Sequence, residues 1–111
     1  MNELAVKKLQ EALRIGNVVV SFFKDEEDGG TVNFDHPMLM KPDDMTKKEV
    51  EESFSRANVR FEYEKSGIYK GWYHIYGVTL GIGNRRTTMA EKFSEALKNF
   101  GFTSAVYYQM D

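Results

Sequence analysis

The sequence predicts an α+β fold: one mostly antiparallel sheet of about five strands, with three helices packed mainly on one face. Two observations support this prediction. Apolar positions change between a helical period of 3.6 and a strand period of 2 along the chain. A unit of helix, short break and strand also occurs three times, at residues 9–23, 50–64 and 93–108. The predicted order is αββαββαβ, and its later elements can also form a ferredoxin-like βαββαβ core.

The composition describes a globular chain without cysteine chemistry. At 111 residues the chain is expected to form a single domain over residues 1–111. The absence of cysteine excludes a disulfide scaffold, a thiolate metal site and a cysteine nucleophile. No apolar run reaches the roughly 18 residues of a membrane span. The N-terminal segment lacks a secretory apolar region, so a cytoplasmic location is expected.

Charge is distributed unevenly behind the net value of −2. Residues 24–53 carry ten acids and four bases, whereas residues 56–92 carry seven bases and three acids. If these segments fold onto different faces, the surface is dipolar and favours a charged partner. The alternative is that the acids form a solvated hairpin tip and a solvated helix face.

The first third of the chain predicts a helix followed by a hairpin. The helix should begin after Asn2, a good N-cap, and end at Gly16. Residues 18–23 are β-branched and aromatic, which favours a strand. Residues 24–30 form a charged turn that closes on Asp-Gly-Gly, and a short strand is expected at residues 31–34.

The stretch from residue 36 to residue 44 is predicted to be irregular, because Pro37 and Pro42 act as breakers. Met38 and Met40 flank a leucine between these prolines. We expect these three apolar residues to pack on the core as a loop plug. An exposed binding lip is the alternative, because methionine adapts to irregular surfaces.

The second helix is predicted from the capping box of Thr46 and Glu49, and a strand with regular alternation follows at residues 59–64. A longer strand is expected over residues 68–80. A second capping box, Thr88 with Glu91, predicts the start of the third helix. The last strand is expected at residues 102–110. Side chains from the three repeated units should form one core, represented by Leu13, Phe54 and Leu97.

The loop of residues 81–88 is the best candidate for an anion site. It leaves a strand and opens a helix, whose N-terminus favours negative charge. Its glycines allow close approach of a ligand, and its arginines offer forked donors. The motif lacks the third glycine and the downstream acid of a dinucleotide site, and it lacks the lysine of a phosphate-binding P-loop. The alternative is that these residues only connect a strand to a helix. The candidate residues are Gly83, Asn84, Arg85, Arg86 and Thr87.

Aromatic residues on the predicted strand of residues 68–80 form a second candidate. Alternation places Trp72 and Tyr76 on one face with His74, and Tyr73 with Ile75 on the other. Together with Arg60 and Lys70, the first set can stack nucleic-acid bases. The alternative is that cross-strand aromatic pairs only stabilise the sheet.

Residues for catalysis are scarce. The two histidines, His36 and His74, have no obvious carboxylate spacing around them, and Asp43 with Asp44 are expected to cap a helix. We therefore predict no catalytic residue, no metal site and no cofactor, and we do not expect an enzyme.

The favoured hypothesis is a small regulatory protein that acts by protein–protein contact, as an inhibitor or adaptor of the mobile-element type. The residues expected to contact the partner are Asp25, Glu26, Glu27, Asp28, Met38, Met40, Glu51 and Glu52. The first alternative is a nucleic-acid-binding module. It would use Arg60, Lys70, Trp72, Tyr76, Gly83, Asn84, Arg85, Arg86 and Thr87. The second alternative is a binder of a phosphorylated small ligand at residues 83–88. A homodimer through an exposed sheet edge is also open.

Overall fold

The computed structural model describes residues 1–25, 29–30, 33–79 and 83–109. Within them the order is α1 (Glu3–Ser21), β1 (His36–Met40), α2 (Lys47–Ala57), β2 (Arg60–Tyr63), β3 (Trp72–Tyr76), α3 (Gly83–Asn99) and β4 (Ser104–Tyr107). The strands form one antiparallel sheet in the order β2-β3-β1-β4. The α+β prediction is confirmed, with four strands in the described residues instead of about five. From β1 onward the chain has the ferredoxin-like βαββαβ order.

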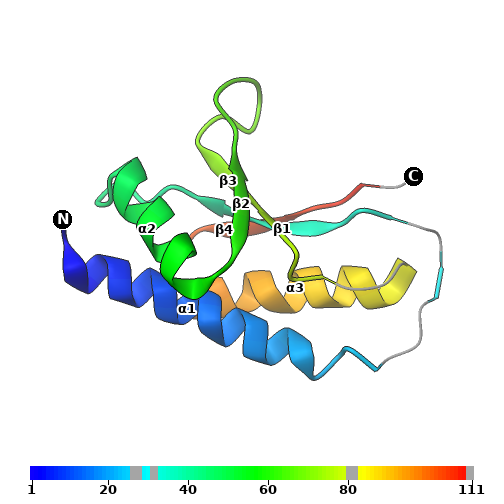
Figure 1. Cartoon of the computed structure of the whole chain (residues 1–111). Helices are drawn as coiled ribbons and strands as arrows, with labels where there is room; N and C mark the ends of the chain where they lie inside the picture. Colours follow the sequence, from blue (N-terminus) through cyan, green and yellow to red (C-terminus); the bar gives the residue numbers. More distant parts are fainter. Residues whose placement is uncertain (26–28, 31–32, 80–82, 110–111) are drawn as a thin grey trace.

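The helices form a layer against one face of the sheet (Figure 1). Helix α3 lies on β1 and β4, α2 contacts β2, and α1 packs against both α2 and α3. Leu13, Phe54 and Leu97 are fully buried in a single cluster between the helices and the sheet. The expected common core is therefore confirmed.

The first predicted strand is wrong, because α1 continues past Gly16 to Ser21. Residues 18–23 have high strand propensity, but burial of Val20 against the core outweighs that weak preference. Gly16 lies inside the helix and does not end it. A Cβ atom there would come within 2.7 Å of Phe93 Cε2. The glycine therefore lets α1 approach α3 closely.

The predicted loop of residues 36–44 is also corrected, because His36–Met40 forms β1, a central strand. Pro37 pairs in register with Val106 of β4. Backbone N–H groups of β1 point alternately toward β4 and toward β3, and the nitrogen of Pro37 points toward β3. Because proline has no N–H, one hydrogen bond between β1 and β3 is missing. Met38 is buried in this strand, whereas Met40 is 40% exposed.

Several local predictions are confirmed. Asn2 caps α1, and Thr46 with Glu49 forms the capping box of α2. The second capping box is wrong, because α3 begins at Gly83 and Thr88 lies within it. β3 and β4 are shorter than expected. The predicted turn at residues 24–30 and strand at residues 31–34 fall partly on positions 26–28 and 31–32, outside the described residues.

The alternation of side chains predicted for residues 72–76 is confirmed in β3. Tyr73 and Ile75 are fully buried on the helix side of the sheet. Trp72, His74 and Tyr76 therefore lie on the opposite side, which we call the outer face. Among the described residues, no helix is both long enough and apolar enough to cross a membrane.

Candidate binding surfaces of the sheet

β4 forms one edge of the sheet and borders a groove. The groove has a volume of about 390 Å³ and lies between β4 and α3. Its walls are formed by Glu91, Ser94, Glu95 and Lys98 on the helix side, and by Ser104, Ala105, Val106 and Tyr108 on the strand side. Among the described strands, β4 therefore provides an exposed edge of the kind that strand pairing between two copies would need.

The hydrogen-bond pattern shows which backbone groups of β4 face outward. Met40 N–H donates to Thr103 C=O at 2.9 Å, and Phe34 N–H donates to Gln109 C=O at 2.6 Å. In an antiparallel ladder only alternate residues bond to the same neighbour. The backbone groups of Ser104 and Val106 therefore point away from β1, toward the free edge.

The edge of β4 is short, at four residues, but it lacks two other features that protect such strands. Its sequence, Ser-Ala-Val-Tyr, contains neither a charged residue nor proline. Ser104 Oγ donates to Met38 C=O at 2.7 Å and lies 2.7 Å from Ser94 Oγ on α3. These contacts hold β4 in place, so the edge is a fixed template for another strand.

One end of the groove contains an ionisable pair. Tyr108 is 63% exposed and lies near Glu91 of α3. Partial burial and, after it, the charge of Glu91 raise the pKa of the Tyr108 hydroxyl. The tyrosine therefore remains a neutral hydrogen-bonding group at neutral pH.

The outer face carries a cluster of rings from three strands and one loop. His36 stacks on Tyr107 with centroids 5.1 Å apart, and His74 stacks on Tyr76 at 6.2 Å. Tyr69, from the β2–β3 loop, contacts the rings of His74 and Tyr107. The two imidazoles are nearly buried within this cluster, at 4% and 5% exposure.

The two histidines, which the sequence left unconnected, form a continuous hydrogen-bond chain. His36 Nδ1 donates to Phe34 C=O at 3.0 Å, so that nitrogen carries a proton. His36 Nε2 lies 2.8 Å from His74 Nδ1, and His74 Nε2 lies 3.0 Å from Glu64 Oε1. With His36 neutral and protonated on Nδ1, its Nε2 can accept a hydrogen bond from His74 Nδ1. Burial lowers the pKa of His36, which favours its neutral form.

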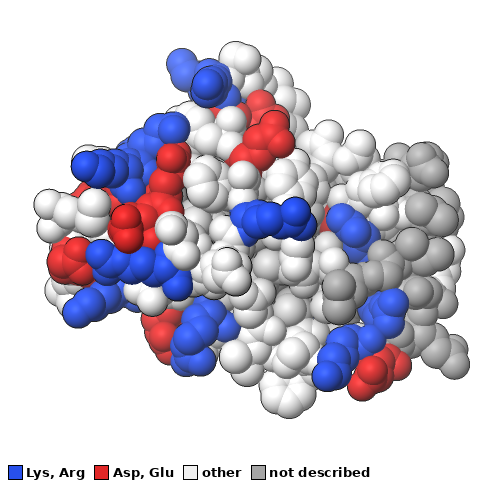
Figure 2. Space-filling model, viewed as in Figure 1, with Lys and Arg blue, Asp and Glu red and all other residues white. Residues whose placement is uncertain are grey.

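Among the described residues, those expected to contact a protein do not form one acidic surface. Glu51 pairs with Lys47 at 2.6 Å, and Glu52 pairs with Arg56 at 2.8 Å. Acidic and basic side chains are mixed around α1 and α2 in Figure 2. Asp25 is exposed, but Glu26, Glu27 and Asp28 lie outside the described residues. Since Met38 is buried, only Met40 of the expected lip is exposed.

In the expected anion loop, residues 81 and 82 lie outside the described residues, and residues 83–86 are engaged in contacts within the chain. Gly83 has a φ of +64°, and the carbonyl of Gly29 accepts from Asn84 N–H at 2.5 Å. A Cβ atom at Gly83 would lie 1.7 Å from that carbonyl oxygen. Arg85 donates to Lys24 C=O, and Arg86 Nε donates to Asp35 C=O. The backbone N–H of Asn84 and the two arginine side chains therefore attach the segment between α1 and β1 to the start of α3.

Asp35 provides the negative charge near the start of α3. It is 4% exposed, and its carboxylate accepts from Thr87 Oγ1 at 2.6 Å and from Gln109 N–H at 2.7 Å. Asp35 thus joins the segment before β1 to α3 and to the segment after β4. Sequence reasoning missed this residue, because nothing in its local pattern distinguishes it from a solvated loop acid.

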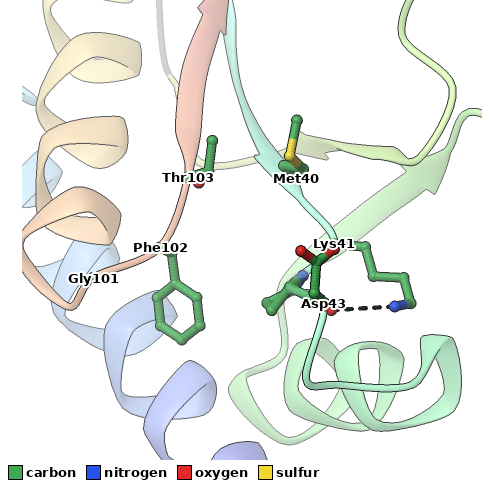
Figure 3. A pocket seen from close by; sticks show the side chains of 7 residues that line it. Met40, Lys41, Asp43, Gly101, Phe102 and Thr103 are labelled. Carbon is green, nitrogen blue, oxygen red and sulfur yellow. Dashed lines mark hydrogen bonds between the residues drawn. The ribbon is translucent and has the colours of Figure 1, made fainter.

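A smaller pocket of about 220 Å³ lies between the end of β1 and the turn before β4 (Figure 3). Met40, Phe102 and Thr103 contribute to its walls. The Lys41 ammonium group donates to the carbonyl of Pro42 at 3.1 Å. Since its basic side chain is bound to its own backbone, this pocket offers little to an anionic ligand.

The residues of the nucleic-acid hypothesis separate into two groups. Arg60 is opposite Tyr76 in the β2–β3 ladder, so both lie on the outer face with Trp72. Lys70 lies in the loop that leads into β3. The remaining candidates, from Gly83 to Thr87, lie at the start of α3 and take part in the contacts described above.

Comparisons with protein-family models, with curated proteins and with solved structures each gave no match. Within the described residues, no group of three or more His, Cys, Asp or Glu side chains is arranged to hold a metal ion. The edge of β4 and the outer face of the sheet are therefore the two candidate binding surfaces.

Proposed function

We propose that the protein acts by protein–protein contact, and that an extended segment of its partner adds to the sheet along β4. The observation that carries this proposal is the free, uncharged edge of β4 beside the groove of α3. Strand addition of this kind is a common mode of peptide recognition, in which backbone hydrogen bonds provide affinity and side-chain pockets provide specificity.

The geometry of the edge defines how the partner segment would bind. The outward N–H and C=O groups of Ser104 and Val106 would pair with the backbone of the added strand. Alternate side chains of that strand would enter the groove against α3. A basic side chain there would meet Glu91 or Glu95, whereas Lys98 lies on the same wall and favours an acidic one.

A proline substitution tests the edge without removing a ladder hydrogen bond. Val106→Pro removes an N–H that faces the free edge, so the sheet should keep its bonds to β1. We expect a partner isolated with the tagged protein to bind this variant at least about tenfold more weakly. Amide hydrogen exchange should show that the partner protects Ser104 and Val106 in the wild-type protein.

Ala105→Pro is the matched control for the fold. Its N–H faces β1, so this variant should lose thermal stability, whereas Val106→Pro should unfold near the wild-type temperature. Unchanged partner affinity in a folded Val106→Pro variant, with no amide protection along β4, would overturn the proposal. Tyr108→Pro removes the next outward N–H and provides an independent second variant.

A further inference from the structure

The outer face of the sheet has properties that protein contact at the β4 edge does not use. The helices lie on the opposite side of the sheet (Figure 1). The outer face carries rings from both central strands and from β4. Trp72, Tyr76 and Tyr107 are all half-buried there, so part of each ring remains accessible. Met40, opposite Trp72 in the ladder, is 40% exposed.

The rings of Tyr76 and Tyr107 are held in position before any ligand arrives. His36 and His74 are hydrogen-bonded to each other at 2.8 Å, and each stacks on a tyrosine, Tyr107 and Tyr76 respectively. The loop residue Tyr69 contacts this cluster through His74 and Tyr107. A ligand that stacks on these rings would therefore pay little conformational entropy to order them.

In the described part of the chain, three bases and two acids lie around these rings. Arg60 on β2, and Lys65 and Lys70 in the β2–β3 loop, are exposed. Basic side chains project at the tip of this hairpin in Figure 2. Two carboxylates lie nearby, but Glu64 faces His74 at 3.0 Å, which leaves Glu62 as the exposed acid of β2.

We propose that the outer face binds single-stranded nucleic acid. Bases would stack on Trp72 and Tyr76, and Arg60 with the two loop lysines would contact phosphates. Aromatic platforms flanked by basic residues bind single strands with little sequence preference, because every base offers a flat face. The chain as a whole carries a net charge of −2, so binding should be weak and strongly reduced by salt.

The chain contains its own probe, because Trp72 is its only tryptophan. A titration with a ten-nucleotide oligothymidylate at 20 mM salt should quench the Trp72 fluorescence. Raising the salt to 200 mM should reverse the quenching. If fluorescence is unchanged and a dye-labelled oligonucleotide shows no anisotropy change at low salt, the proposal is wrong.

Two double variants remove the same charge from different surfaces. Arg60→Ala with Lys70→Ala should lower the slope of log affinity against log salt by about 1.4, the value expected for two phosphate contacts with a single strand. Lys7→Ala with Lys48→Ala removes two exposed bases from helices and should leave the affinity nearly unchanged. Equal losses in both variants would show general charge attraction and would contradict the proposed site.

A third comparison separates this proposal from the one for β4. Val106→Pro should bind the oligonucleotide as the wild-type protein does, since its change lies at the edge. Trp72→Leu should weaken oligonucleotide binding and leave protein contact at β4 unaffected. If Trp72→Leu binds the oligonucleotide like the wild-type protein but loses a protein partner, the outer face is a protein-binding surface and the nucleic-acid proposal is wrong.

Discussion

The two faces of the sheet are built from the same strands but differ in chemistry. Tyr73 and His74 are neighbours on β3, and both are nearly inaccessible to solvent. Tyr73 packs among the rings of Phe54 and Phe61 on the helix side. His74 instead takes part in a chain of hydrogen bonds that ends at Glu64. Alternation along one strand thus separates an apolar core from a polar, proton-bearing cluster.

This difference indicates separate roles for the two faces. Apolar burial is insensitive to pH and contributes most of the stability of a small domain. A buried polar chain contributes less net stability, but it fixes orientations and makes them depend on protonation. We therefore expect mutations on the helix face to change stability most, and mutations on the outer face to change its pH dependence.

The largest expected effect is on the helix face. Phe54→Ala removes a fully buried ring from the centre of the core and should lower the free energy of unfolding by about 3–5 kcal/mol. Tyr76→Ala, which truncates a half-buried ring of the outer face, should cost clearly less in the same urea titration. Equal losses would show that the outer face contributes to stability as the core does.

Asp35, which joins α3 to the segments before β1 and after β4, should have the next largest effect. Asp35→Ala leaves the Gln109 N–H and the Thr87 hydroxyl without this acceptor, and we expect a loss of about 2–3 kcal/mol in unfolding free energy. Asp43→Ala changes an exposed acid and serves as the control. A wild-type urea midpoint for Asp35→Ala would contradict the structural role of this carboxylate.

The pH dependence of stability should separate the two faces further. Because burial lowers the pKa of folded His36, protonation favours the unfolded chain. Stability from this group is complete above about pH 6.5, the unfolded pKa, and is lost as the pH falls through the lower folded value. The charged or titratable groups that influence the pKa of His36 after burial are His74, Arg86 and Asp35.

Thermal unfolding between pH 7.5 and pH 5 measures this effect. His36→Phe should reduce the loss of stability on acidification, whereas Phe54→Ala should lower the melting temperature at every pH and keep the wild-type slope. The same slope in His36→Phe as in the wild-type protein would assign the pH dependence to other groups.

The smallest effect is expected on the solvent-exposed side of α2. Glu52→Gln removes an exposed ion pair with Arg56, and such pairs contribute little because water and salt screen them. The urea midpoint should be nearly unchanged, and any small difference should vanish in 0.5 M salt. A clear loss that persists at high salt would indicate that the charge of Glu52 has a structural role.

Much of the fold could be predicted because local signals and tertiary packing agree over most of the chain. The caps at Asn2 and Thr46 satisfy free N–H groups through side chains close in sequence, so their pattern is visible locally. The alternation of side chains along β3 likewise reflects the apolar core on one side of the sheet and the outer face on the other. These signals predicted the fold class and the common core.

The predictions failed where distant contacts outweigh local preference. The β-branched residues after Gly16 favour a strand, but α1 is held in place by α2 and α3. Pro37 indicates a loop, yet its missing N–H costs only one bond in β1. The partners of Asp35 and of the two histidines come from distant segments, and no spacing within the sequence reveals such contacts.

The position of α1 also has a consequence for the order of folding. This helix is synthesised before α2 and α3, whose surfaces cover its apolar side, and α3 ends only at Asn99. On the ribosome, the side chains of Val6, Leu9 and Leu13 therefore remain uncovered until α3 has emerged. During that interval the nascent helix would expose an apolar stripe to which chaperones can bind.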